Sequence, residues 1–177
     1  MPESSNQNFN HIKIHSQYSI CEGAVKIDNL QDFSKSNRIK ALGLCDTSNL
    51  CGALEFAEKI SKVGTQPIIG TQINFKYGEC SGLLPLFALN EEGYKRRIKL
   101  SSISFLENDE LSDPHIDFEE LLQDNTGVAV FSGSIFGLFG ELFNKGKFSE
   151  IFELYKKLKS NFIFVLKVKH NLKFYPT

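Results

Sequence analysis

The stretch that decides the fold is ALGLCDTSNLCGALEFAEKISKVG, residues 41–64. Its first residues, Ala41 to Cys45, form a short apolar run that stops at Asp46 and predicts a buried strand. Apolar residues then recur at helical spacing until Gly64 ends the predicted helix: Ala53, Phe56, Ala57 and Ile60. A strand followed by a helix is the repeating unit of α/β proteins, so we expect an α/β fold.

Further strands and helices alternate on both sides of this unit. The predicted strands cover residues 11–15 (HIKIH), 67–77, 83–89, 127–131 and 162–168. The predicted helices cover residues 29–36 (with Asp28 as the N-cap), 91–105, 117–122 and 148–159. One face of the helix over 91–105 should carry Ile98, Ser101, Ser102 and Phe105. The alternation predicts a mainly parallel sheet or an α/β barrel.

The predicted domain spans residues 10–177, after a polar lead over residues 1–9. A complete α/β barrel needs about 250 residues. The sequence stops directly after a predicted strand, with no helix to cover it. We therefore expect an incomplete barrel.

Composition limits the function classes. Lys and Arg number 20 against 21 Asp and Glu, so the formal net charge is −1. A domain that grips duplex DNA by itself usually carries a basic excess, so we do not expect a main DNA-binding surface here. No apolar run approaches the roughly 20 residues of a membrane helix, and residues 1–10 lack a secretory signal. The expected location is the cytoplasm.

The four cysteines, Cys21, Cys45, Cys51 and Cys80, show neither C-x-x-C spacing nor a paired framework, so free thiols are expected.

Polar side chains stand where three predicted strands end or pass. His15 closes the first strand, Asp46 closes the second, and Gln72 lies on the third. In an α/β barrel such strand ends meet at one rim, where imidazole and carboxylate groups can hold a divalent ion such as Mn²⁺ or Zn²⁺. A bound ion would activate water for phosphoester hydrolysis.

The supply of ligands at this rim is poor. Lys13 lies between His11 and His15 on the same predicted strand face, and its ammonium repels a metal. Thr47 and Gln72 are neutral and bind metals weakly, while a metal site usually needs at least three protein ligands. Only His15 and Asp46 remain as good ligands. We therefore favour the alternative that they hydrogen-bond to each other or to loop backbone, with no metal and no catalytic residue.

Two other segments have functional and ordinary interpretations. Ser132, Gly133 and Ser134 follow a predicted strand and could form an anion-binding turn, but no nucleotide-binding glycine motif accompanies them, which favours an ordinary tight turn. A basic cluster on a predicted helix is more typical of a solvated face than of a nucleic-acid patch: Lys95, Arg96, Arg97 and Lys99.

Five blocks of the sequence, in order and at the right spacing, resemble the polymerase and histidinol phosphatase (PHP) domain of bacterial replicative polymerase alpha subunits. There the blocks have the forms H-x-H-x-x-x-S, A-L-x-x-T-D-H-G-N-L-x-G-x-x-x-F, K-P-I-I-G-x-E, L-x-A-x-N-x-x-G-Y-x-N-L-x-x-L-S and G-L-I-x-L-S-G-C. The corresponding segments here are HIKIHSQYSICEGAVKI (11–27), ALGLCDTSNLCGALEF (41–56), QPIIGTQINF (66–75), LFALNEEGYKRRIKLSS (86–102) and GVAVFSGS (127–134).

The resemblance carries over to the metal-site positions one residue at a time. His15 matches the second histidine of H-x-H, and Lys13 replaces the first. Asp46 matches the aspartate of T-D-H-G, while Thr47 replaces its histidine. In the last two positions, Gln72 replaces a glutamate and Ser134 a cysteine. The resemblance therefore implies a degenerate metal site whose two remaining ligand types, at His15 and Asp46, hold no ion.

The same resemblance implies a fold, a role and partners. The family fold is a distorted (β/α)7 TIM-like barrel fused ahead of the polymerase domains. The parent protein would be a DNA-directed DNA polymerase active in DNA replication, and this segment lacks the polymerase active site. Its implied role is to support the other polymerase domains and to dock the proofreading exonuclease subunit, with DNA contacted only through the parent polymerase. The alternative is a free-standing metal-dependent PHP phosphoesterase or exonuclease.

Overall fold

The computed structural model describes residues 10–108 and 112–165. In chain order the elements are α1 (Ile27–Asn37), β1 (Ala41–Thr47), α2 (Ala53–Lys62), β2 (Gln66–Tyr77), β3 (Cys80–Ala88), α3 (Glu91–Leu106), β4 (Ile116–Asp117), α4 (Phe118–Leu122), β5 (Val128–Phe131), α5 (Leu138–Asn144), α6 (Phe148–Asn161) and β6 (Ile163–Val165). The α/β class is confirmed. The predicted lead over residues 1–9 and the predicted strand residues 166–168 lie outside the described residues.

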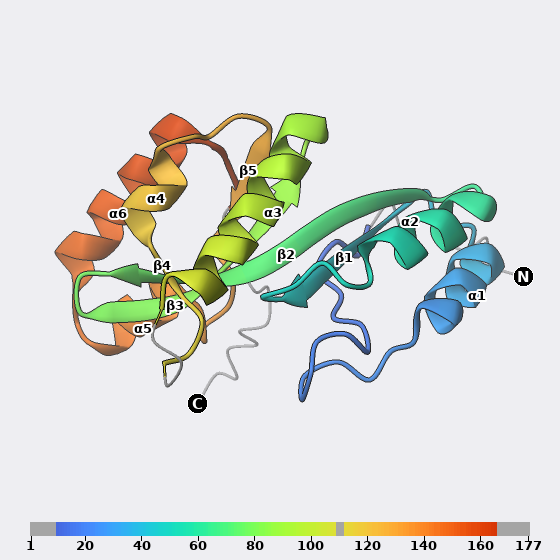
Figure 1. The fold of residues 1–177 in the computed structure, drawn as a ribbon, viewed down its shortest axis with the longest axis horizontal. Helices are drawn as coiled ribbons and strands as arrows, with labels where there is room; N and C mark the ends of the chain where they lie inside the picture. Colours follow the sequence, from blue (N-terminus) through green and yellow to red (C-terminus); the bar gives the residue numbers. More distant parts are fainter. Residues whose placement is uncertain (1–9, 109–111, 166–177) are drawn as a thin grey trace, which may run out of the picture.

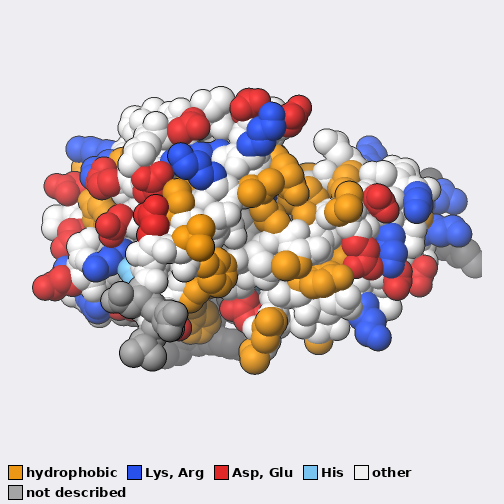
Figure 2. All heavy atoms as spheres, in the orientation of Figure 1, with side chains coloured by type: hydrophobic (Ala, Val, Ile, Leu, Met, Phe, Trp, Pro, Cys, Tyr) orange, Lys and Arg blue, Asp and Glu red, His pale blue; other side chains and the backbone are white. Residues whose placement is uncertain are grey.

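The long strand β2 connects the two parts of the molecule (Figure 1). One part holds α1, β1 and α2, and the other holds α3 to α6. On the face shown in Figure 2, charged side chains crowd the two ends, and hydrophobic atoms are exposed across the centre. No helix within the described ranges is long and apolar enough to span a membrane.

The six-stranded sheet is mixed but mainly parallel, as predicted: among the described residues, every strand except β3 runs in the same direction. Its strand order is β1-β2-β3-β5-β6, with β4 paired to β2. The reversal occurs at β3, which is antiparallel to both of its neighbours. Only Gly78 and Glu79 separate Tyr77 from its partner Cys80, and a connection that short can only form an antiparallel hairpin. Over the residues that the structure describes the sheet is open, so the predicted barrel is not confirmed.

Residues 11–15 are extended, but they do not form the regular strand that the alternation predicts. Ile14 makes an isolated parallel bridge to Leu44. The carbonyl groups of His11 and Ile14 accept the amides of Gly43 and Cys45, each at 2.8 Å. The two carbonyl groups are three residues apart in the sequence, whereas the two amides that they accept are only two residues apart, as in a β-bulge. The extra residue breaks the alternation of side chains expected for a regular strand.

One hydrophobic cluster joins β1 to the first two helices: Ile27, Leu30, Leu42, Leu44, Phe56 and Ile60. In α2, three of the four residues predicted at helical spacing, Ala53, Phe56 and Ile60, are buried, and Gly64 follows the helix with φ +78°. In α1 the N-cap is Lys26, without a side-chain cap, so the prediction of Asp28 as N-cap is wrong. Asp28 lies inside the first turn, where its negative charge interacts favourably with the positive end of the helix dipole.

A larger cluster fills the space between β2, β3 and β5 and the helices α3 to α6. Its members include Ile73, Leu84, Val130, Leu142 and Leu158. This cluster anchors the part of the molecule that is farther from β1. A third, smaller cluster consists of Cys45, Phe87 and Ala129. Strand β2 contributes to the larger cluster while pairing with β1.

Helix α3 buries a different face from the predicted one. Ile98 and Phe105 are exposed, and the buried residues are Gly93, Arg96, Arg97, Leu100 and Ser104. The spacing is helical, but two of the buried positions carry arginines that the sequence pattern assigned to solvent. The expectation of a solvated basic face therefore fails at Arg96 and Arg97.

Candidate functional site

Asp46, the next-to-last residue of β1, is the centre of the candidate site. Its side chain is buried, and its carboxylate accepts three hydrogen bonds. The Ser16 amide donates to Oδ1 at 2.6 Å, the Ser16 hydroxyl to Oδ2 at 2.8 Å, and the Ser19 hydroxyl to Oδ1 at 2.7 Å. Neutral hydroxyl and amide donors thus surround this buried charge.

The donors come from the loop that follows residues 11–15. Ser19 also accepts the amide of Thr47 at 3.1 Å, so one hydroxyl connects the loop to β1 twice. The loop folds back so that Gly23 packs directly against the backbone of Ser16. Only glycine fits there, because a Cβ on residue 23 would lie 1.9 Å from the Ser16 carbonyl oxygen. Sequence reasoning did not single out these serines, although Ser19 occupies the serine position of the H-x-H-x-x-x-S block and could have been found there.

A second chain of contacts joins three neutral or acidic side chains beside Asp46. The Gln72 amide donates to the Thr47 hydroxyl at 2.7 Å, and that hydroxyl donates to the Glu22 carboxylate. Parallel pairing places Thr47 directly opposite Gln72. Glu22 was missed at the sequence level, because its loop gives no periodic signal that would aim it at β1.

His15 lies at the edge of this group. Burial lowers the pKa of its imidazole below the ordinary value of 6.5, and the nearby positive charge of Lys13 lowers it further. Its Nδ1 is 3.9 Å from the nearer Glu22 oxygen, too far for a hydrogen bond. At the two histidine positions of the family's H-x-H motif, this chain therefore carries the ammonium group of Lys13 and an imidazole, His15, whose pKa is lowered.

Ser134 is the last of the six motif positions. It follows β5, and its hydroxyl accepts the amide of Phe136 at 3.2 Å, in a turn with Gly133 at φ +80°. This is an ordinary tight turn, as the sequence favoured. Between Ser134 and the Asp46 group the described residues show no hydrogen bond.

The arrangement does not fit a divalent metal ion. Three donors use three of the roughly four acceptor positions of the Asp46 carboxylate, and the positive charge of Lys13 acts on His15. Within residues 10–108 and 112–165, no group of three or more His, Cys, Asp or Glu side chains could hold an ion. Thr47 and Gln72 are hydrogen-bonded to each other, as neutral groups at such positions can be.

The basic cluster on α3 does not form a nucleic-acid patch. Arg96 donates to the carbonyl and carboxylate of Glu120, which ties α3 to α4. Arg97 is fully buried, and its Nε contacts the Gly93 carbonyl at 3.4 Å. Lys95 is paired with Glu91 at 2.9 Å on the exposed side. Two of the four cations are therefore unavailable to phosphate.

The amino-acid sequence matches the PHP domain family over residues 11–170. DNA polymerase III subunit alpha of Rickettsia felis is 38% identical over 134 residues, which cover 75% of this chain and 11% of that protein. The same subunit of Caulobacter vibrioides is 33% identical over 159 residues (85% and 14%). That of Borreliella burgdorferi is 32% identical over 179 residues (93% and 16%). The chain thus spans less than a fifth of the length of these relatives.

Among solved structures, one from Bifidobacterium adolescentis, provisionally assigned as a metal-dependent phosphoesterase, aligns with 95% of this chain and 58% of its own. The TM-score is 0.42 and the identity 14%. A likeness this weak adds nothing to the assignment of a function.

Proposed function

The chain belongs to the PHP domain family and is homologous to the N-terminal region of DNA polymerase III subunit alpha, and on that premise we propose that it is a supporting and docking domain of a replicative DNA polymerase. In this proposal residues 10–177 form one PHP domain of the cytoplasm. Nucleotide transfer and DNA contact belong to other parts of the polymerase. The partners are those other domains and the proofreading exonuclease subunit.

The hydrogen bonding of Asp46 carries the proposal. A carboxylate that serves a metal keeps its oxygens directed at the ion, with supporting groups behind it. Here both oxygens accept donors from the loop of residues 16–19, so the carboxylate holds that loop against β1. The group has become structural, which suits a domain that supports others.

Metal titration tests the loss of the metal site. We expect isothermal titration calorimetry of the 177-residue chain with MnCl₂ or ZnCl₂ to give no stoichiometric binding. We expect no metal-dependent hydrolysis of bis(4-nitrophenyl) phosphate either. His15→Ala should leave both results unchanged. If the wild type binds one ion per chain and His15→Ala does not, the metal site has been kept, and a purely supporting role is contradicted.

The alternative, a free-standing metal-dependent phosphoesterase, has one observation in its favour. The Glu22 carboxylate lies beside His15 and Thr47, and two buried atoms, Nδ1 of His15 and Oε1 of Gln72, have no hydrogen-bond partner within the described part of the chain. If these groups served an ion, Glu22→Gln would abolish a metal-dependent activity that the wild type possesses. Absence of activity in the wild type rules this alternative out.

A binding experiment tests the docking role. We expect the immobilised 177-residue chain to retain the purified proofreading exonuclease subunit, while an unrelated protein of the same size does not. It should not retain a labelled DNA duplex, because the net charge is −1 and two basic residues of α3 are buried. Failure to hold the exonuclease removes the docking role and leaves only support.

A further inference from the structure

Five large apolar side chains are more than half exposed around helices α5 and α6. We call them the α5–α6 patch: Ile135, Phe136, Phe143, Phe148 and Phe152. A single exposed apolar residue is ordinary, but a contiguous group marks an interaction surface. The Phe143 and Phe148 rings touch edge to face, with centroids 5.6 Å apart. Phe152 follows Phe148 by one turn of α6, and Ile135 and Phe143 line the same pocket.

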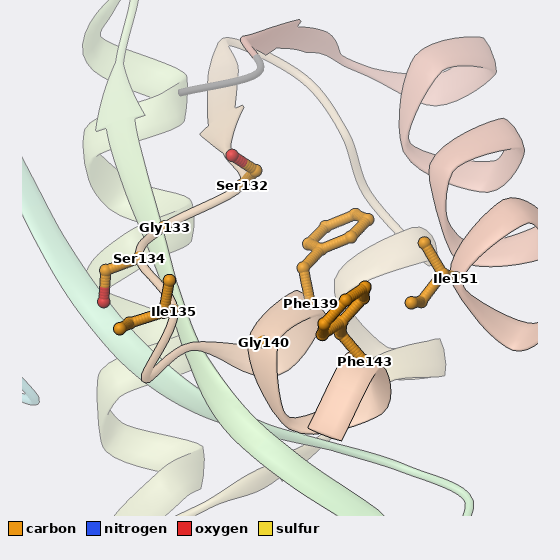
Figure 3. Close-up of a pocket in the computed structure, with 8 residues that line it drawn as sticks. All are labelled: Ser132, Gly133, Ser134, Ile135, Phe139, Gly140, Phe143 and Ile151. Atoms are coloured by element: carbon orange, nitrogen blue, oxygen red, sulfur yellow. The ribbon is translucent and has the colours of Figure 1, made fainter. Parts of the chain in front are cut away.

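The pocket has a volume of about 340 Å³ and mainly apolar walls. Phe139, Phe143 and Ile151 lie on one side of it, and Ile135 lies on the other (Figure 3). Pockets of a few hundred Å³ with apolar walls accept apolar or aromatic groups. The hole is therefore suited to an aromatic side chain.

A side chain of that kind stands immediately beside the hole. Phe136 follows Ile135 of the pocket wall and is 84% exposed, the most exposed phenylalanine of the described residues. A surface that carries a projecting ring next to an apolar hole is complementary to itself. When two copies meet about a two-fold axis, each ring faces the hole of the other copy.

The charges around the patch favour the same partner. Glu141 pairs with Lys145 at 3.0 Å, and Lys147 pairs with Glu150 at 3.2 Å. Positive and negative side chains thus alternate beside the patch. Two copies that approach each other through it are therefore not repelled by a surface charge of one sign. Lys156 adds one further cation, 4.3 Å from the centroid of the Phe152 ring. One cation beyond two neutral pairs is no strong basic excess for a polyanion such as nucleic acid.

The exposed area is large enough for a specific contact between two copies. A large apolar side chain buries about 150–250 Å² when it is fully covered, and these five are 57–84% exposed, so they offer roughly 500–800 Å² per copy. Two copies would bury about 1,000–1,600 Å², which reaches the range of specific interfaces. We expect a dimer that forms in the micromolar range.

We propose that the chain forms a symmetric dimer through the α5–α6 patch, with Phe136 of each copy seated in the pocket between Ile135 and Phe143 of the other. The inference is independent of the polymerase role, since it uses none of the Asp46 group. It depends on the apolar surface and its pocket alone.

Sedimentation velocity of the 177-residue chain, from on the order of 1 µM to 200 µM, tests the dimer. We expect the wild type to shift from monomer to dimer over this range. Phe136→Ser should raise the dimer dissociation constant at least about tenfold, since losing one buried aromatic anchor in each copy costs more than 1.4 kcal/mol. Circular dichroism should show an unchanged fold, because the Phe136 side chain is exposed.

Leu106→Ser is the matched control, since Leu106 is 81% exposed at the end of α3 and lies outside the patch. It should dimerise like the wild type. A wild type that stays monomeric throughout overturns the proposal. So does a dimer that Phe136→Ser leaves intact, or one that Leu106→Ser weakens equally.

Discussion

Two buried charged groups, one at the end of β1 and one on α3, are treated in opposite ways by the fold. Asp46 accepts three hydrogen bonds from the loop that follows residues 11–15. Arg97 is as deeply buried, yet its two terminal nitrogens have no hydrogen-bond partner among the described residues. Its guanidinium lies over the ring of Tyr94, with the central carbon 5.5 Å from the ring centroid.

The two charges differ in how the fold compensates for their burial. A buried charge is tolerated when donors or counter-charges replace the water it has lost. Asp46 stands at an aspartate position of the family motif, and the loop around it supplies those donors. Arg97 stands where the motif has a leucine, and no carboxylate within the described ranges faces it. Burial lowers the pKa of Arg97 to about 10, so it remains charged near neutral pH.

The largest expected effect comes from removing the satisfied charge. Asp46→Ala leaves one amide and two hydroxyl groups without their acceptor, so we expect a loss of about 3–5 kcal/mol in the free energy of unfolding. For a chain of this size the melting temperature should fall by roughly 6–20 °C. Asp46→Asn keeps one acceptor oxygen and should lose less. Thermal unfolding followed by circular dichroism measures both.

Asp32→Ala provides the control, because Asp32 lies on the solvent face of α1. It should change the melting temperature by little. If Asp46→Ala and Asp32→Ala behave alike, the hydrogen bonds to Asp46 carry no net stability, and the comparison with Arg97 loses its meaning.

The opposite sign is expected at the unsatisfied charge. Arg97→Leu removes a buried cation and restores the side chain of the family motif, so the chain should gain about 1–4 kcal/mol. Chemical denaturation with urea would show a higher midpoint at unchanged slope.

Arg96→Leu, one residue earlier on the same helix, sharpens this test. Arg96 is also buried, but it donates to Glu120, so its removal should cost about 1 kcal/mol. Destabilisation by both substitutions would mean that Arg97 has acceptors such as ordered water, and that the two regions differ less than their contacts indicate.

The smallest effect concerns pH at the edge of the Asp46 group. The pKa of His15 is lowered in the folded chain, mainly by burial, so below about pH 6.5 the unfolded chain binds the proton first. Stability should therefore decrease as the pH falls from about 7.5 to about 5. His15→Asn, which cannot gain a proton there, should show a flatter dependence in denaturation curves recorded across this range. An identical slope in both proteins would show that other groups set the pH dependence.

Local sequence patterns were sufficient for much of the fold. The strand and helix over residues 41–64 were predicted because apolar spacing there follows the period of each element. The two ends of α2 and the strands β2, β3 and β5 followed from the same kind of signal. The position of Asp46 at the end of β1 was equally visible, since a single charge terminates an apolar run.

The candidate site was only partly predictable. The motif positions Lys13, His15, Asp46, Thr47 and Gln72 could be located by spacing, and their altered residue types indicated a degenerate metal site. The motif marks the position of Ser19, but it does not show that Ser19 and Ser16 donate to Asp46, because both lie about 30 residues before it in a loop. Glu22 was missed for the same reason.

By itself the sequence determined most of the strands and helices, though not α5 or the irregular path of residues 11–15, together with the resemblance to the PHP family and the weakness of the metal ligands. These properties depend on residue type and on spacing within one element, and both can be read along the chain. Only the tertiary structure decided that β3 runs against its neighbours, that α3 buries Arg97, and that serine hydroxyls serve Asp46. Each of these depends on which distant segment lies opposite, and that is fixed by the packing of the whole chain.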